Sequence, residues 1–200
     1  GPRPAGIASD LVRLGNAGFI VPSRDNVYII AIPEDCRHHT MTAHMAVMTE
    51  PAYGPDILRQ DVTKLLFAYL DTLFRAGQAV ALYDVGAWVG DVAIRLAVFA
   101  RQRGARFSAD CFDPSLAGTL IPFNIELNGV ADLVRYRPVG VSVSGGPAVF
   151  TQLHGHSDSA RLESIGTGDM AADSYVIRTV TLGECLRPPQ PGMHEFVKID

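Results

Sequence analysis

The sequence has few cysteines, no long apolar segment and no excess of positive charge. Its three cysteines, Cys36, Cys111 and Cys185, are odd in number and far apart, which indicates reduced thiols rather than a disulfide framework. No run reaches the roughly 18 consecutive apolar residues of a membrane-spanning helix, and the N-terminus has no apolar signal-peptide core. With 17 Lys and Arg against 21 Asp and Glu, the formal net charge of −4 provides no global basic field. We therefore expect a cytoplasmic protein without nucleic-acid or membrane partners.

The 200 residues also lack fixed-period repeats and low-complexity tracts, and their hydrophobic fraction of 48% suits one buried core. What is present is an alternation of strands and helices. The patterns predict a helix over 56–76, a strand over 79–84, a helix over 92–99, a strand over 106–112, a helix over 116–127 and a strand over 135–142. Pro122 predicts a kink in the last helix or a later start for it. Strand, helix and strand in succession imply a parallel sheet.

The two ends of the sequence have a different pattern. Residues 19–21 and 27–32 are β-rich runs around a turn cluster and predict a hairpin. Residues 1–50 are therefore interpreted as an N-terminal extension and residues 51–200 as the main domain. Residues 145–173 predict a hairpin followed by a mobile loop, residues 176–182 an edge strand and residues 196–200 a buried strand. The apolar stripe of residues 58–74 faces the core or a second copy of the chain, which leaves a homo-oligomer open.

The most informative stretch joins the strand over 79–84 to the next helix. It reads Asp84-Val85-Gly86-Ala87-Trp88-Val89-Gly90-Asp91, an acid followed by two glycines four residues apart. Glycines at such a turn let the backbone bend sharply and let a ligand approach. A dinucleotide site needs G-x-G-x-x-G, and an acid at this position repels a pyrophosphate. The pattern favours a ligand that carries ammonium or sulfonium charge, as S-adenosylmethionine does.

Asp113 follows the second strand, 23 positions after Gly90. A carboxylate there can accept two hydrogen bonds from a ribose diol. Pro114 stands at what would be the first position of a helix, so Asp113 can also cap that helix. The two roles do not exclude each other.

Five blocks of the sequence together resemble the FkbM family of S-adenosylmethionine-dependent methyltransferases. The blocks are Asp84 to Asp91, Phe112-Asp113-Pro114, Asn124 to Gly129, Arg178-Thr179-Val180-Thr181-Leu182 and Phe196-Val197-Lys198-Ile199-Asp200. The resemblance covers residues 50–200. It implies a Rossmann-like class I methyltransferase fold, an α/β architecture with a mainly parallel sheet and helices on both faces. It also implies methyl transfer to a hydroxyl oxygen of a sugar, glycan or natural-product small molecule.

The resemblance assigns roles residue by residue. The loop beside the methionine part of the cofactor would consist of Asp84, Gly86, Ala87, Trp88 and Gly90, with Asp91 opening the next helix. Asp113 would hold the ribose. Gly140 and Val141 would lie along the adenine, and Asp200 would stand beside the methyl-transfer centre.

The sequence departs from the family at several positions. Trp88 replaces a small polar residue, so the indole must either cover the cofactor or pack under the helix. Asp113 stands where glutamate is commoner, and Gly183-Glu184 replaces Asp-Glu. The family continues with Glu-Gly and three more strands, so the resemblance implies a domain truncated after the fourth strand.

Histidines provide the remaining candidates. Cys36 with His38, His39 and His44 suggests zinc, but no second ligand pair follows at the required spacing, so we expect no metal. A hydroxyl acceptor must lose a proton, and Asp200 is the first candidate base, with His154 and His156 in the predicted loop as the second. Two alternatives stay open: a non-catalytic methyltransferase-like binding module, and a nicotinamide-dependent oxidoreductase, which the missing middle glycine disfavours.

Overall fold

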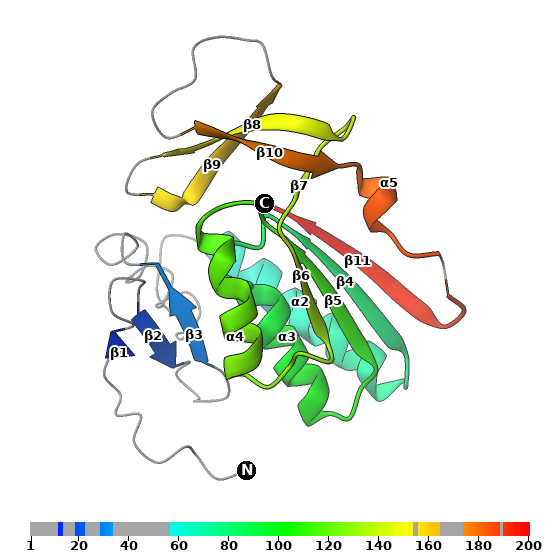
Figure 1. Ribbon diagram of the computed structural model, residues 1–200. Coiled ribbons are helices and arrows are strands. Elements are labelled where there is room, and N and C mark those ends of the chain that lie inside the picture. Colours follow the sequence, from blue (N-terminus) through cyan, green and yellow to red (C-terminus); the bar gives the residue numbers. More distant parts are fainter. Residues whose placement is uncertain are drawn as a thin grey trace.

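The computed structural model describes residues 12–13, 19–22, 29–33, 57–153, 156–164, 174–188 and 190–200 of an α/β fold (Figure 1). Three sheets are present among them. The strands are β1 (Val12–Arg13), β2 (Phe19–Pro22), β3 (Ile29–Ile32), β4 (Ala79–Val85), β5 (Phe107–Phe112), β6 (Val134–Arg137), β7 (Gly140–Val141), β8 (Gly146–Leu153), β9 (His156–Ser164), β10 (Ser174–Val180) and β11 (Met193–Ile199). The helices are α2 (Ile57–Arg75), α3 (Asp91–Gln102), the 3₁₀ helix η2 (Ala117–Leu120), α4 (Ile121–Leu127) and α5 (Leu182–Cys185).

The central sheet is wholly parallel and has the order β11-β4-β5-β6. Strand β4 is buried along its whole length, which explains its almost continuous apolar sequence. The chain passes from β4 through α3 to β5 and through α4 to β6, and later returns to the other side of β4 as β11. The parallel sheet predicted from the alternation of strands and helices is confirmed, in an arrangement compatible with a Rossmann-like fold.

The three longer helices pack against one face of this sheet. Buried side chains of α2, α3 and α4 form one core cluster with Val80, Leu82, Ala109 and Cys111, whose side chains alternate onto that face. On the opposite face, among the described residues, the short helix α5 supplies Cys185 to a smaller cluster with Tyr83 and Val85. The prediction of helices on both faces therefore needs correction. The second face has a one-turn helix because its β5 and β6 positions include charged residues, which a broad apolar helix would leave unsolvated.

The N-terminal hairpin of β2 and β3 is confirmed, and β3 joins the main core. Asn124 of α4 and Asn128, the residue that caps the C-terminus of this helix, bind the backbone of β3 as a neighbouring strand would. The Asn124 side chain accepts from Ala31 N at 2.6 Å and donates to Ala31 O at 3.0 Å. The Asn128 side chain makes the same pair of bonds with Ile29, at 2.9 and 2.5 Å. The domain boundary placed at residue 50 lies outside the described residues.

A second sheet has the order β7-β10-β8-β9. The strand predicted over 135–142 is divided: it leaves the central sheet after Arg137, and Gly140–Val141 pair with Thr179 and Val180 of β10. The hairpin predicted after residue 145 is confirmed as β8 and β9, while residues 165–173 of the predicted loop lie outside the described residues. The expectation of an edge strand at 176–182 is wrong, because β10 pairs with β7 on one side and β8 on the other.

Candidate functional site

The strand order defines where a ligand crevice is expected. In open α/β sheets, ligands bind outside the carboxyl ends of the strands at the point where the chain changes direction across the sheet. Here that point lies between β4 and β11, which pair in parallel from Met193↔Ala79 to Ile199↔Val85. The sequence after β4 is the glycine turn, and Asp200 directly follows β11.

The glycine turn has three residues in the left-handed backbone region. Gly86 has φ 71°, and a Cβ there would lie 3.2 Å from the Cβ of Asp200. Gly90 has φ 80°, and a Cβ there would contact Ile94 and Ile121 at 3.2 and 3.3 Å. Gly86 thus allows β4 and the end of β11 to approach each other, whereas Gly90 allows α3 to pack against α4. Trp88 is the third residue, with φ 51°, a conformation that is strained for a bulky side chain.

The indole of Trp88 resolves one alternative left by the sequence. Trp88 is 8% exposed and belongs to the core cluster that contains Ile94 and Ile121. Its side chain therefore packs under the helices. Its backbone N–H donates to Asp113 Oδ2 at 2.6 Å, which connects the turn after β4 to the end of β5.

Lys198 brings two of the predicted acids together. Its Nζ lies 3.1 Å from Asp84 Oδ1 and 3.0 Å from Asp200 Oδ2, and it donates to Gly86 O at 3.2 Å. The register explains this, because Lys198 is the direct cross-strand partner of Asp84. The ammonium thus joins the ends of β4 and β11 to the first glycine of the turn.

Asp84 is 0% exposed, and among the described residues neither carboxylate oxygen receives a well-formed hydrogen bond besides its ion pair with Lys198. Burial and, to a smaller extent, the charges of Asp91 and Asp200 raise the pKa of Asp84 to about 6, against the opposing effect of Lys198. Burial lowers the pKa of Lys198, but Asp84, Asp200 and Asp91 together outweigh burial and raise it. Three carboxylates therefore act on the Lys198 ammonium.

Asp113 has two backbone partners. In addition to Trp88 N, its carboxylate accepts from Ser115 N at 2.8 Å, within the turn that follows β5. The expected capping of a helix that begins at Pro114 is wrong, because η2 begins at Ala117 with Leu116 at its N-cap and has no side-chain cap hydrogen bond. Asp113 is 6% exposed, and burial raises its pKa against the lowering effect of the hydrogen bonds from Ser115 and Trp88. The Ser115 side chain also bonds this carboxylate, so three of its roughly four acceptor positions are occupied. Tyr136 Oη donates to Asp113 O at 2.9 Å and fixes the same segment.

A hollow of about 410 Å³ opens on the other side of the β4 and β11 ends. Because side chains alternate along a strand, Val85 and Ile199 point away from the face that carries Asp84 and Lys198. The hollow is lined by Val85, Val141, Ser142, Val143, Thr181, Leu182, Gly183 and Ile199. Its walls are mostly apolar, and it lies next to the switch point.

The remaining predicted residues are distributed unevenly. Asp91 begins α3, and Ala87 is buried in the turn. Val141 lines the hollow, but a Cβ on Gly140 would lie 2.9 Å from Ile177, so Gly140 packs against β10. His154 lies outside the described residues, as do Cys36, His38, His39, His44 and the side chain of His156.

Sequence reasoning missed two kinds of residue. Lys198 is visible in the sequence as a single lysine in an apolar strand, but the sequence does not identify Asp84 as its partner, because that contact depends on strand register. Asn124 and Asn128 had the spacing of one helix face, and Asn124 also donates to Val89 O at 2.9 Å in the glycine turn. Their target, β3, is about 93 residues away in sequence, so spacing alone does not identify it.

The fold and the site define an α/β protein with a parallel sheet and a glycine turn at its switch point, where Lys198 pairs with two aspartates. No known family profile, no curated protein and no solved structure matches the chain. Among the described residues, no helix is both long and apolar enough to cross a bilayer.

Proposed function

We propose that the chain is an S-adenosylmethionine-dependent O-methyltransferase domain that acts on a sugar, glycan or natural-product small molecule. The observation that carries the proposal is the convergence of Gly86, Asp84 and Asp200 around Lys198 at the carboxyl ends of β4 and β11. These residues come from two separate blocks of the family resemblance. The hydrogen bond from Trp88 N to Asp113 joins a third block to the same place.

The charges of the turn fit the cofactor. The carboxylates of Asp84, Asp91 and Asp200 all act on the Lys198 ammonium, and the negative potential of such groups favours a cationic ligand. The buried Asp84 carboxylate lacks well-formed hydrogen bonds among the described residues. Neutral donors therefore do not offset its negative charge. Asp113 would bind a ribose hydroxyl through its remaining acceptor position, and Gly86 and Asp200 would lie beside the methionine part. When bound, S-adenosylmethionine supplies a methyl group on a sulfonium sulfur, which leaves as a neutral thioether.

The chain's own residues would position the acceptor and remove its proton. The apolar walls of the hollow would restrict the orientation of the acceptor, which is catalysis by positioning. Asp200, with its side chain 48% exposed, can accept the hydroxyl proton on its carboxylate. The Lys198 ammonium, 3.0 Å from Asp200 Oδ2, orients that carboxylate.

Calorimetric titration with S-adenosylhomocysteine tests the proposal. We expect binding by the chain, and a loss of about tenfold or more for Asp113→Asn, because hydrogen bonds to charged groups contribute about 1.5–3 kcal/mol. Asp132→Asn is the matched control, since this carboxylate is 69% exposed and pairs with Arg101 on the surface. A melting temperature for each variant separates a binding effect from a loss of structure. Absence of binding by the unmodified chain contradicts the proposal.

A non-catalytic binding module is the second candidate, and three contacts favour it. Both Asp113 oxygens already accept from backbone N–H groups, and Lys198 already neutralises part of the charge on Asp84. For such a module, Asp113→Asn lowers stability and S-adenosylhomocysteine does not bind. Binding of NADH would instead support an oxidoreductase.

A further inference from the structure

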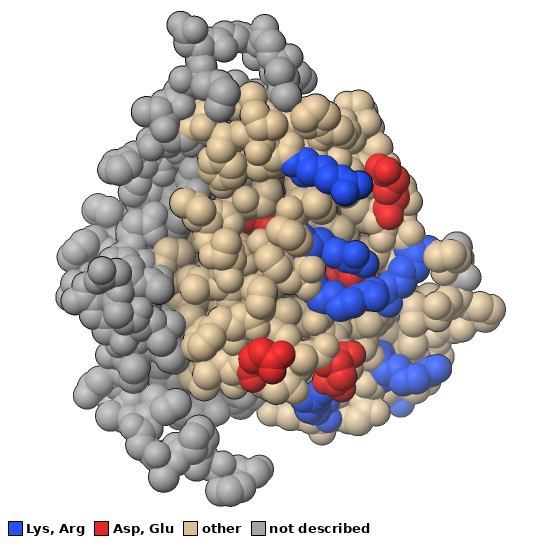
Figure 2. Space-filling view, viewed as in Figure 1, with Lys and Arg blue, Asp and Glu red and all other residues tan. Residues whose placement is uncertain are grey.

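Three arginines surround one buried aspartate on the face of the parallel sheet opposite α2, α3 and α4. Asp110 of β5 is 2% exposed and pairs with Arg135 Nη2 at 3.0 Å, Arg137 Nε at 3.5 Å and Arg187 Nη2. Three guanidinium groups pair with this one carboxylate, and the neighbouring Glu195, which accepts from Tyr83 Oη at 2.8 Å, reduces the excess of positive charge to one. Blue surface gathers in this part of the face in Figure 2.

The sheet and the segment after α5 hold these guanidinium groups in place. Arg135 and Arg137 alternate onto the same face of β6, about 7 Å apart along the strand. Arg187 comes from the other side, donates to Ser108 Oγ at 2.9 Å and is fixed by its backbone bond to Tyr83 Oη at 3.0 Å. The cluster is therefore organised without a ligand, which reduces the entropy that ordering these side chains on binding would cost.

Many donors of the cluster remain available. A guanidinium has five N–H donors in a planar fork, and the side chains of Arg135 and Arg137 are 53% and 54% exposed. The Nε of Arg187 also has no hydrogen-bond acceptor among the described residues, but it is buried, so the exposed donors are those of Arg135 and Arg137. Arginine forks match the geometry of phosphate and carboxylate groups, to which they bind in pairs of parallel hydrogen bonds.

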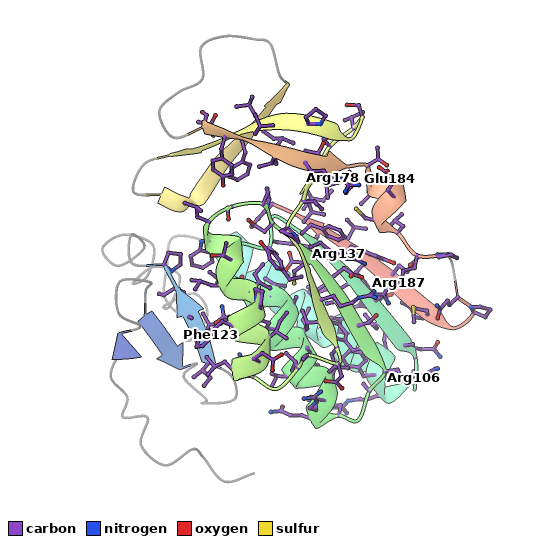
Figure 3. The ribbon with its side chains drawn as sticks, in the orientation of Figure 1. Arg106, Phe123, Arg137, Arg178, Glu184 and Arg187 are labelled. Carbon is purple, nitrogen blue, oxygen red and sulfur yellow. The ribbon has the colours of Figure 1, made fainter. Side chains whose placement is uncertain are left out.

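The arginine cluster lies next to the hollow. Cys185 of α5 packs near Val85 and Phe112, and the charge of Arg137 acts on the Cys185 thiol. Leu182 and Gly183 of the same short helix line the hollow. Figure 3 shows Arg137 and Arg187 on the viewer's side of the sheet, with Arg178 and Glu184 toward the α5 end.

We propose that Arg135, Arg137 and Arg187 form a subsite for an anionic group, a phosphate or a carboxylate, carried by the acceptor molecule. The hollow takes the part of the acceptor that bears the hydroxyl, and the arginine cluster holds its charged part. The identity of the ligand as an acceptor rests on the proposed function, whereas the binding of an anion does not.

The test is a titration of the whole chain followed by NMR of the arginine Nε–Hε groups, at constant ionic strength. The probes are inorganic phosphate, a galacturonate oligosaccharide and a neutral oligosaccharide of the same length. We expect saturating shifts at the three arginines with phosphate, galacturonate or both, and none with the neutral probe. The tighter of the two anionic probes identifies the source of the charge. Arg137→Gln should weaken binding about fivefold, the effect of one partly exposed charge pair.

Arg75→Gln is the matched control, because it removes the same charge from α2, where the Arg75 side chain is 77% exposed. Equal shifts at Arg75 and at the cluster, or unchanged binding by Arg137→Gln, would overturn the proposal. Tenfold tighter binding of hexaglutamate than of either small anion would also overturn it, in favour of a protein partner. S-adenosylhomocysteine titrated in parallel separates the two proposals. Binding of an anion but not of S-adenosylhomocysteine refutes only the methyltransferase. Binding of S-adenosylhomocysteine but of neither anion refutes only the subsite.

Discussion

Replacement of Lys198 by methionine tests the electrostatics of the turn. Methionine keeps a flexible side chain of similar length but removes the ammonium that lies 3.1 Å from Asp84 Oδ1 and 3.0 Å from Asp200 Oδ2. Asp200 is partly exposed and can be solvated, whereas Asp84 is 0% exposed. The variant therefore leaves a buried carboxylate without its ion-pair partner.

The magnitude follows from the pKa of Asp84. The folded pKa of about 6 exceeds the ordinary 3.8, so Asp84 binds a proton more tightly in the folded protein than in the unfolded chain. The associated stability is fully present below pH 4 and is lost as the pH rises through 6, by about 3 kcal/mol in total. Without Lys198 the folded pKa rises further, so the additional loss develops only at higher pH. Removal of one partner of a buried ion pair typically costs about 3–5 kcal/mol.

We expect Lys198→Met to lower the free energy of unfolding by about 3 kcal/mol at pH 8 and by about 1 kcal/mol or less at pH 5. Urea titration followed by the fluorescence of Trp88, the single tryptophan, measures both values. The double variant Asp84→Asn/Lys198→Met removes both charges and should recover most of the loss at pH 8. Equal losses at pH 5 and pH 8, or no recovery in the double variant, would refute the reasoning.

Three further predictions concern the packing around the turn. Asn124→Leu leaves the backbone groups of Ala31 and Val89 without their side-chain hydrogen bonds. It should lower the free energy of unfolding by about 2–4 kcal/mol in urea titration, and Glu126→Gln at an exposed position of the same helix is the control. Gly90→Ala should lower the melting temperature more than Gly77→Ala, because both have positive φ but only Gly90 meets neighbours within 4 Å. The Cys111 thiol is buried and its pKa is raised by burial, so mass spectrometry should find it alkylated only after unfolding.

The order of the central elements was predictable from the sequence because each has a clear local pattern. The strand and the helix on either side of the glycine turn are found where hydrophobic periodicity predicts them. Pro122 correctly indicated a later helix start, since a 3₁₀ turn over Ala117–Leu120 precedes α4. Such features depend on residues close together in sequence.

Pairings between distant segments were not predictable in the same way. The position of β10 inside its sheet depends on β7, a strand of two residues without a pattern of its own. The contact of Lys198 with Asp84 depends on the register of β11 against β4. A shift of one residue would turn the Lys198 side chain to the other face of the sheet. The cluster around Asp110 likewise brings together three strands or loops through one buried carboxylate.

The turn after β4 is the place where local preference and observed structure conflict most. A tryptophan at φ 51° is disfavoured by about 1–2 kcal/mol, and nothing in the local sequence compensates for it. The compensation comes from tertiary structure, because the indole is buried in the core and Asp113 binds the backbone N–H of the same residue. Strained residues persist where the surroundings determine them, and they cluster at functional sites. The Asp113 carboxylate thus stabilises the turn that contains Trp88 and Gly86. A ligand that formed a hydrogen bond with this carboxylate would therefore also affect the conformation of the turn.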